Sequence, residues 1–208
     1  MPIYWSPSSK TALAESELEY EENHRSISIY VKFPLIPPKH FPNELHRSSP
    51  LHALVWTTTP WTLPANRAIC FNPDLKYVQI RFKTDPNVFL VAQDCVGRLE
   101  EVFGQTIDIL GGLEGEDIGR YSYAHPLSSQ LTLTSPASRP LPLLPSKHVT
   151  TAKGSGLVHA APAHGHEDYH ALRACGLRVD EDPLVDRQGK FTQDAGEALR
   201  GLDVLDSG

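Results

Sequence analysis

Prolines and short apolar runs constrain the fold of this chain more than any other feature. The 208 residues include 18 prolines, and each one removes a backbone N–H donor and fixes its own φ angle. Long helices and long uninterrupted strands do not accommodate residues of this kind. The apolar residues between the prolines come in short runs, which have the length of a strand of about four to eight residues. The sequence therefore predicts many short strands and only a few short helices.

Five segments carry the strand signal most clearly, because their apolar residues alternate or run continuously and then end at turn residues. They are 27–33, 51–56, 67–71, 76–82 and 87–92. Pro60 and Pro64 prevent strand pairing directly after the second of them. The overall pattern is typical of a β-rich α+β domain, and a barrel is one arrangement that satisfies it.

The remaining elements follow from weaker signals of the same kinds. We expect strands at 106–110, 131–134, 148–152 and 157–160; helices at 93–104 and 166–176; a hairpin at 184–191; a helical turn at 195–201; and proline-rich loops at 34–50 and 135–145. Gly104 and Gly176 would end the two helices, since glycine adopts the left-handed conformation that closes a helix.

The charge and the cysteines exclude several classes of protein. The formal net charge is −6, whereas a free-standing nucleic-acid binder is usually basic, so any contact with a polyanion must be local or rely on another domain. Cys70, Cys95 and Cys175 lie far apart, which argues against a disulfide framework or a cysteine zinc site and favours a reducing compartment. Both ends look cut, and we expect the chain to be a piece of a larger protein.

One short motif, His166-Glu167-Asp168-Tyr169-His170, reads H-E-x-x-H. On a helix this spacing places two imidazoles on one face with a glutamate beside them, as in a zinc hydrolase. The expected helix is short, however, and nothing singles out a third ligand from candidates such as Glu181 and Glu197. The competing interpretation is that His166 and His170 are surface or helix-cap residues, and this is the interpretation we favour.

Two other segments together resemble a known family. "WTTTPWTLPAN" (56–66) and "GSGLVHAAPAHGHEDY" (154–169) resemble the editing domain inserted in isoleucyl-tRNA synthetases, and "YWSPSSKTALAESELEY" and "LVDRQGKF" extend the resemblance over nearly the whole chain. The mitochondrial form is the most similar. The resemblance implies one β-rich α+β domain over 1–208, a β-barrel of the valyl, isoleucyl and leucyl editing type with a few short helices. It also implies that 1–25 and 195–208 join this domain to the catalytic core.

The resemblance also implies an activity. The chain lacks the H-I-G-H and K-M-S-K-S signatures of the aminoacylation core, so ATP binding and tRNA charging would belong to the parent enzyme. A pocket for isoleucine rejects valine weakly, because one methylene is worth only about 1–3 kcal/mol, a value established for this enzyme class itself. The implied function is hydrolysis of valyl-tRNA(Ile) at a second site that excludes isoleucine by size. A catalytically inactive tRNA-binding module is the alternative, besides the zinc hydrolase.

The two motifs supply the candidate site residues. Asp168, in the first turn of a helix whose N-terminus favours an anion, would bind the substrate's α-ammonium group; the alternative is that it only caps the helix. The threonine hydroxyls would hold water, the ester carbonyl or the ribose, unless they merely finish a strand. The candidate catalytic residues are Thr57, Thr58 and Asp168, and the candidate substrate-binding residues are Thr59, Trp61, Thr62, Asn66, Gly154, Ser155, Gly156, His159, Ala160 and Asp168.

Four of these assignments carry a specific alternative. Asn66 would bind the substrate, but it could equally be a turn residue in the left-handed conformation or in an Asx turn. His159 would line the pocket and block the extra methyl group of isoleucine, although a histidine in an apolar strand is more often a hydrogen-bonded core residue. Trp61 would wall the entrance or simply pack. The turn at 153–156 lacks the glycine spacing of a P-loop, and we expect it to contact the terminal adenosine of tRNA.

The resemblance finally sets expectations for partners and location. The partners would be the 3′ end of aminoacylated tRNA(Ile), a valine moiety or valyl-adenylate, and the remainder of the synthetase, with no membrane, cofactor or metal. The location would be the mitochondrial matrix, with the cytoplasm as the alternative.

Overall fold

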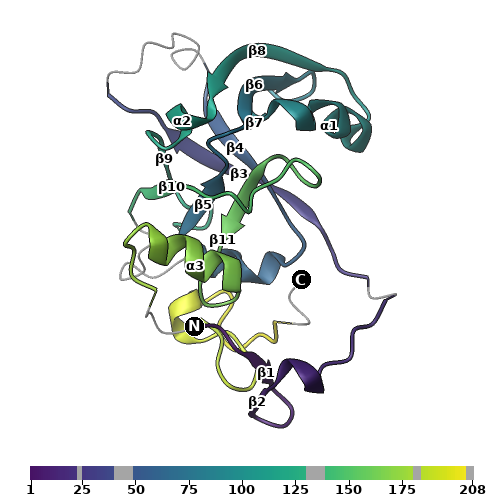
Figure 1. The fold of residues 1–208 in the computed structure, drawn as a ribbon, viewed down its shortest axis with the longest axis vertical. Coiled ribbons are helices and arrows are strands. Elements are labelled where there is room, and N and C mark those ends of the chain that lie inside the picture. The colour runs from purple at the N-terminus through teal and green to yellow at the C-terminus, as the bar shows by residue number, and fades with distance from the viewer. Residues whose placement is uncertain (23–24, 40–48, 130–138, 180–183, 205–208) are drawn as a thin grey trace.

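A closed β-barrel forms the centre of the molecule (Figure 1). The computed structural model describes residues 1–22, 25–39, 49–129, 139–179 and 184–204. The barrel strands pair in the cyclic order β3–β4–β11–β5–β10–β9 and back to β3, and the ring closes where Val158 of β11 pairs with Trp56 of β4. This arrangement confirms the expected β-rich α+β fold class and its barrel.

The elements are short, as the distribution of prolines requires. The strands are β1 Tyr4–Ser6, β2 Thr11–Leu13, β3 Ile29–Ile36, β4 Leu51–Thr57, β5 Ala68–Phe71, β6 Lys76–Phe82, β7 Val88–Ala92, β8 Ile107–Glu114, β9 Ser122–Tyr123, β10 Leu141–Pro145 and β11 Leu157–Ala160. The α-helices are α1 Val96–Phe103, α2 Gly115–Ile118 and α3 His166–Ala174, and the 3₁₀ helices are η1 Glu15–Glu17, η3 Pro60–Ala65, η4 Gln93–Cys95 and η6 Gln193–Ala195.

Strand β4 belongs to two sheets. Its first residues, Leu51–Ala53, pair in parallel with β7, and from there the sheet continues through β6 to β8. Inside the barrel, its residues 52–57 pair with β3, and Trp56 pairs with β11. This branch gives the molecule an upper part, built from β6, β7, β8 and α1, that is continuous with the barrel below it (Figure 1). The threonine turn leaves β4 at the barrel end.

Side chains alternate between the inner and outer faces of the barrel strands, and β5 shows what covers each face. In β5, Ile69 and Phe71 pack in the main core, while Ala68 and Cys70 point the other way and pack against Leu172 of α3. Successive strand residues face opposite sides, so β5 is apolar on both faces because both faces are covered. Helix α3 is thereby fixed on the outside of the barrel beside β10 and β5.

The chain ends pack together at the base of the barrel. Leu184, Phe191 and Val204 form a small apolar cluster with Ala65 of η3. Trp5 in β1 donates its indole N–H to the carbonyl of Arg187, at 2.9 Å. The β1–β2 hairpin therefore lies at the opposite end of the molecule from β8 (Figure 1). That 1–25 and 195–208 lead to a catalytic core remains a prediction.

Several of the expected elements differ from those observed. The proline-rich segment 135–145 was expected to be a loop, but its end forms β10, which pairs with β5 and β9. A strand was expected at 148–152, where the chain instead forms turns. The prediction for 34–50 was wrong at its start, because β3 continues to Ile36. The strand expected at 131–134 lies outside the described residues. No helix among the described residues has the length and apolarity needed to cross a membrane.

Candidate active site

The threonine turn and the first turn of α3 open onto one cavity. The cavity has a volume of about 310 Å³, and residues from both motifs, within 56–62 and 158–168, contribute to its wall. Its lining residues are Trp56, Thr57, Thr58, Thr59, Trp61, Thr62, Val158, His159, Ala161, His164, Gly165 and Asp168. The loops that carry these residues are far apart in sequence and are brought together by the pairing of β4 with β11.

The threonine turn is held by its own hydroxyl groups. Thr57 is buried at the end of β4, and its Oγ1 accepts a hydrogen bond from the backbone N–H of Thr59 at 3.1 Å. The Thr62 hydroxyl donates to the carbonyl of Thr59 at 2.8 Å. Pro60 begins η3 at a position where no backbone N–H is needed. Thr58 and Thr59 are left exposed on the cavity side of the turn.

Asp168 enters the cavity wall from the first turn of α3, as expected. Its Oδ2 accepts a hydrogen bond at 2.9 Å from the backbone N–H of Ala161, which lies before the helix. A Cβ at position 165 would lie 2.7 Å from Oδ2 and would displace the carboxylate, so Gly165 leaves room for it. Burial raises the pKa of Asp168, and the Ala161 bond partly opposes this. Burial thus works against the anionic form that the helix N-terminus was expected to favour.

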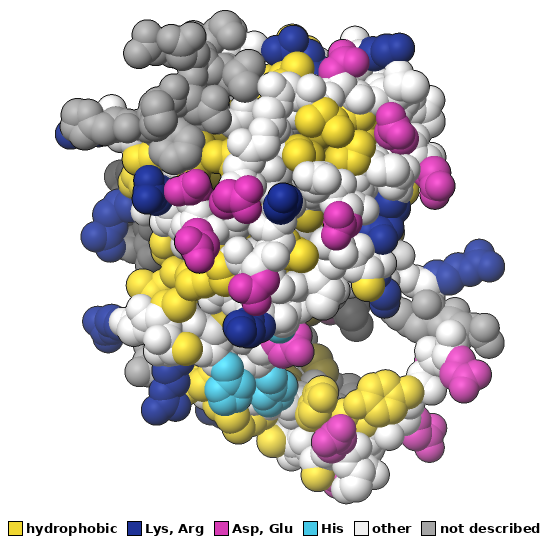
Figure 2. All heavy atoms as spheres, turned by 45° about the horizontal axis from the view of Figure 1, so that its top comes forward, with side chains coloured by type: hydrophobic (Ala, Val, Ile, Leu, Met, Phe, Trp, Pro, Cys, Tyr) yellow, Lys and Arg dark blue, Asp and Glu magenta, His cyan; other side chains and the backbone are white. Residues whose placement is uncertain are grey.

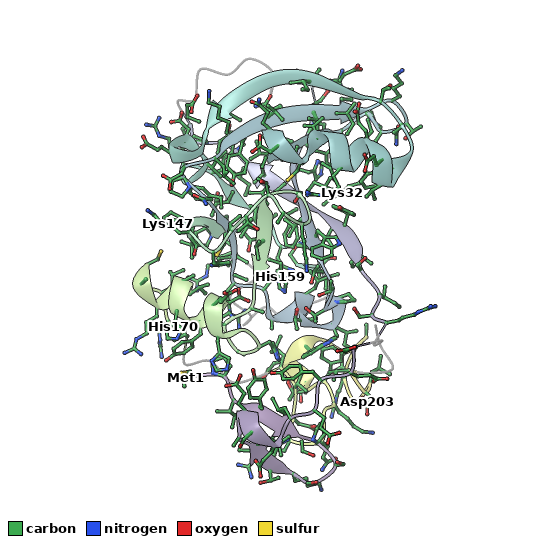
Figure 3. All side chains as sticks on the ribbon, turned by 45° about the vertical axis from the view of Figure 1, so that its right-hand side comes forward. Met1, Lys32, Lys147, His159, His170 and Asp203 are labelled. Carbon is green, nitrogen blue, oxygen red and sulfur yellow. The ribbon has the colours of Figure 1, made fainter. Side chains whose placement is uncertain are left out.

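His159 lies inside the barrel, as Figure 3 shows, with both ring nitrogens occupied. Nε2 lies 2.8 Å from the Thr62 hydroxyl, and Nδ1 lies 2.7 Å from Nδ2 of Asn66. Desolvation, followed by the nearby His125 and His164, lowers its pKa to about 3. A neutral ring with no free nitrogen is a poor general base, so His159 can shape the cavity but is not free to move protons.

The sequence is similar to that of isoleucine–tRNA ligases over its whole length. It is 44% identical over 208 residues to the mitochondrial isoleucine–tRNA ligase of Mus musculus, covering 100% of this chain and 20% of that protein. The isoleucine–tRNA ligase of a Cyanothece species is 42% identical over 216 residues, with the same coverage. The chain belongs to the isoleucine–tRNA ligase family. It spans only about 20% of the length of these relatives.

Solved structures place this isoleucine–tRNA ligase segment among editing-domain folds. The crystal structure of GlLeuRS-CP1 superposes with a TM-score of 0.55 at 17% identity, covering 70% of this chain and 62% of the other. The editing domain of the P. falciparum cytosolic leucyl-tRNA synthetase gives a TM-score of 0.52 at 13% identity, with coverage of 71% and 65%. At such identities the likeness concerns the fold. No family model matches the chain.

Five of the candidate substrate-binding residues of this ligase segment lie behind the cavity wall. Asn66, Gly154, Ser155, Gly156 and Ala160 are buried and are not among the lining residues. Ala160 faces α3 within the apolar cluster that contains Leu172. The turn 153–156 is packed against β4 and β7, and its contact with adenosine remains a prediction.

Five lining residues were not among the candidates: Trp56, Val158, Ala161, His164 and Gly165. His164 is the most informative of them. Its ring meets Trp61 edge-on at 4.9 Å between centroids, and burial lowers its pKa to about 4. Its position between His159 and Asp168 in the second motif was the only signal in the sequence. His164 stays neutral at physiological pH and supports the wall formed by Trp61.

The H-E-x-x-H motif does not form a metal site in the described part of the chain. His166, Glu167 and His170 are exposed on α3 and are not among the cavity-lining residues, and Figure 3 shows His170 on the outer side of the helix. No group of three potential ligands of the His, Cys, Asp or Glu type occurs among the described residues. Glu181, one of the candidate third ligands, lies outside the described residues, and the residues that are described do not provide the geometry that the zinc-hydrolase alternative requires.

Proposed function

We propose that this chain hydrolyses the ester of valyl-tRNA(Ile) and excludes isoleucine by size. The observation that carries the proposal is the convergence of the threonine turn, His159 and Asp168 on one cavity of about 310 Å³. Membership of the isoleucine–tRNA ligase family and the editing-domain fold support it. An ester is already activated, so such a site needs an oriented water and a fixed substrate more than a strong nucleophile.

Asp168 fixes the substrate in this proposal. One carboxylate oxygen is bonded to Ala161, so the other is available to accept from an α-ammonium group. A charge-assisted bond of this kind is stronger than a neutral one. The cation also lowers the pKa of the carboxyl group that burial has raised. The site therefore distinguishes an aminoacyl ester from an ester without an amino group.

The threonine turn holds the reacting groups. The exposed hydroxyls of Thr58 and Thr59 hydrogen-bond the attacking water or the ribose. Water adds to the ester carbonyl carbon, the bond from that carbon to the ribose oxygen breaks, and the oxygen leaves with a proton as the free hydroxyl of tRNA. The products are valine and uncharged tRNA.

Discrimination between valine and isoleucine comes from the rigid part of the cavity wall that His159 forms. His159 is held at both nitrogens and is only 7% exposed, so its ring cannot turn aside for a larger side chain. Forcing an extra methylene into a rigid pocket costs about 1–3 kcal/mol. Valine fits beside the ring in this proposal, and isoleucine does not.

The binding partners and the cellular compartment are also proposals. Acidic and basic side chains are interspersed over the face seen in Figure 2, and with a net charge of −6 the chain itself attracts a polyanion weakly. We therefore expect the remainder of the synthetase to supply most of the affinity for tRNA. The similarity to mitochondrial ligases, at 44% identity, favours the mitochondrial matrix.

The test is single-turnover deacylation at high concentrations of the chain. Valyl-tRNA(Ile) and isoleucyl-tRNA(Ile) are mixed with the unmodified chain, with Asp168→Ala and with Glu167→Ala, the neighbouring exposed acid on the same helix. We expect Asp168→Ala to lower the rate on valyl-tRNA by about 10- to 100-fold, and Glu167→Ala to leave it within about twofold. Equal rates for the unmodified chain and Asp168→Ala would rule out the proposed role, and binding without turnover would indicate a non-catalytic module.

A further inference from the structure

A chain of hydrogen bonds behind the cavity begins at a buried tyrosine. Tyr123 in β9 is fully buried, and its hydroxyl donates to Oδ1 of Asn66. Nδ2 of Asn66 lies 2.7 Å from Nδ1 of His159, and Nε2 of that ring lies 2.8 Å from the Thr62 hydroxyl. The Thr62 hydroxyl in turn donates to the carbonyl of Thr59 at 2.8 Å. These hydrogen bonds thus link β9, which does not line the cavity, to the threonine turn.

Counting protons fixes the direction of every bond in this chain. A carbonyl oxygen only accepts, so the single proton of the Thr62 hydroxyl goes to Thr59. Thr62 must then accept from Nε2–H of His159. In a neutral imidazole the other nitrogen carries no proton, so Nδ1 accepts from Asn66. The ring is therefore the Nε2–H tautomer, and all four bonds donate from Tyr123 toward the threonine turn.

The Asn66 amide is the point at which this direction is set. Its Nδ2 uses one proton on His159 and the other on the carbonyl of Ala68, at 2.9 Å. Its Oδ1 accepts from Tyr123. Without the Tyr123 hydroxyl, Oδ1 would be a fully buried acceptor with no donor. If the Asn66 amide flipped, its oxygen would face Nδ1 of His159 and favour the Nδ1–H tautomer. In that tautomer Nε2 carries no proton and cannot donate a hydrogen bond to Thr62.

We propose that Tyr123 is a positioning residue of this site, because it holds His159 in the Nε2–H tautomer through Asn66. The functional part of the inference depends on the proposed editing activity, and the tautomer does not. Tyr123 does not line the cavity and does not contact the substrate. It determines which ring nitrogen of His159 carries the proton, and thereby whether the Thr62 hydroxyl is free to donate to the carbonyl of Thr59. Burial raises its pKa well above the ordinary value, so the phenol keeps its proton.

The test compares Tyr123→Phe with the unmodified chain. Phenylalanine keeps the ring that packs edge-on against Phe33 at 5.4 Å and removes only the donor. Imidazole ¹⁵N shifts report the tautomer of His159 directly and require no substrate. We expect Nε2–H alone in the unmodified chain and a measurable share of Nδ1–H in Tyr123→Phe. The maximal rate of single-turnover deacylation of valyl-tRNA should fall about tenfold. The concentration of the chain that gives half of this maximal rate should stay within about twofold of that of the unmodified chain.

Tyr121→Phe is the matched control, since Tyr121 is a buried tyrosine only two residues away. It should leave the tautomer of His159 and the rate unchanged. An Nδ1–H ring in the unmodified chain would overturn the proposal even if no variant folds. Full retention of Nε2–H and of the rate in Tyr123→Phe would also overturn it. A tautomer shift in a chain that never deacylates valyl-tRNA would keep the positioning role and reject the proposed function instead.

Discussion

The two ends of β11 are held in different ways: tight steric packing fixes its start, and side-chain hydrogen bonds fix its end. Before the strand, Gly156 has a φ of +76°, and a Cβ there would lie 2.2 Å from the Cβ of Ala92. After two further residues, His159 is bonded at both nitrogens to polar side chains of η3 and its C-cap. The two ends belong to one continuous stretch of sequence, so a motif can mix residues that build the barrel with residues that line its cavity.

The difference has a consequence for substitutions at the two ends. At the glycine end the backbone leaves no room, so damage should appear as lost stability. At the histidine end the side chains are held by hydrogen bonds to specific partners, so damage should appear first as altered bonding at the cavity. Each prediction below tests whether these two kinds of damage can be separated.

The largest effect is expected at the glycine end. Gly156→Ala adds a Cβ in conflict with Ala92 and forces alanine into a left-handed conformation. Overpacking and backbone strain together should lower the free energy of unfolding by about 3 kcal/mol. Urea unfolding measures this. Gly176→Ala is the control, since Gly176 has a φ of +74° but no heavy atom within 4 Å of its Cβ position, and it should cost about 1 kcal/mol. Equal losses would show that packing against Ala92 does not matter.

A smaller effect is expected at the histidine end. Thr62→Val removes the group that accepts from His159 and closes the turn on Thr59. A buried donor left without a partner costs about 1–3 kcal/mol, so we expect a loss of about 2 kcal/mol and an altered ¹⁵N signal from the His159 ring. Thr58→Val, at the exposed position of the same turn, should change stability by less than about 0.5 kcal/mol. A stable Thr62→Val protein with an unchanged signal would contradict the bonding described here.

The buried histidines also make stability depend on pH. Burial lowers the pKa of His164 to about 4, below its ordinary value of 6.5, so the unfolded chain binds the proton that the folded chain rejects. Stability is therefore fully present above pH 6.5 and is lost as pH falls from 6.5 toward 4. His164→Asn removes this contribution, and its unfolding free energy should decline less between pH 6.5 and 5, by about 1 kcal/mol. Parallel pH profiles would contradict a depressed pKa.

The sequence was most informative where local pattern and tertiary packing agree. The expected strand at 76–82 matches β6, and Gly104 closes α1 in the left-handed conformation with a φ of 63°. The pattern failed at β10, where Leu141–Pro145 pairs despite two prolines. A strand between two partners is stabilised by burial on both sides, and no local rule for proline contains that information.

The candidate site shows the same division. The threonine turn and Asp168 were found because the two motifs that carry them resemble the editing domain of isoleucyl-tRNA synthetases, and they do line one cavity. Asn66 and Tyr123 illustrate what the sequence could not supply. Asn66 was expected to contact substrate and instead bonds to His159, and Tyr123, 57 residues away in sequence, directs that bond. Such a link depends on strand pairing that no spacing within the motif reveals.

The smallest effect is expected on the outer face of α3, which provides the sharpest contrast with Asp168. His166→Gln and His170→Gln alter two exposed side chains, one of which only meets the ring of Tyr4 at 6.1 Å between centroids. Exposed substitutions of this kind change stability by less than about 0.5 kcal/mol, and deacylation should stay within about twofold. A chelator should likewise leave deacylation unchanged in the unmodified chain. Loss of activity in both variants, together with stoichiometric zinc in the purified chain, would restore the metal-dependent alternative and transfer the chemistry from the inner to the outer face of this helix.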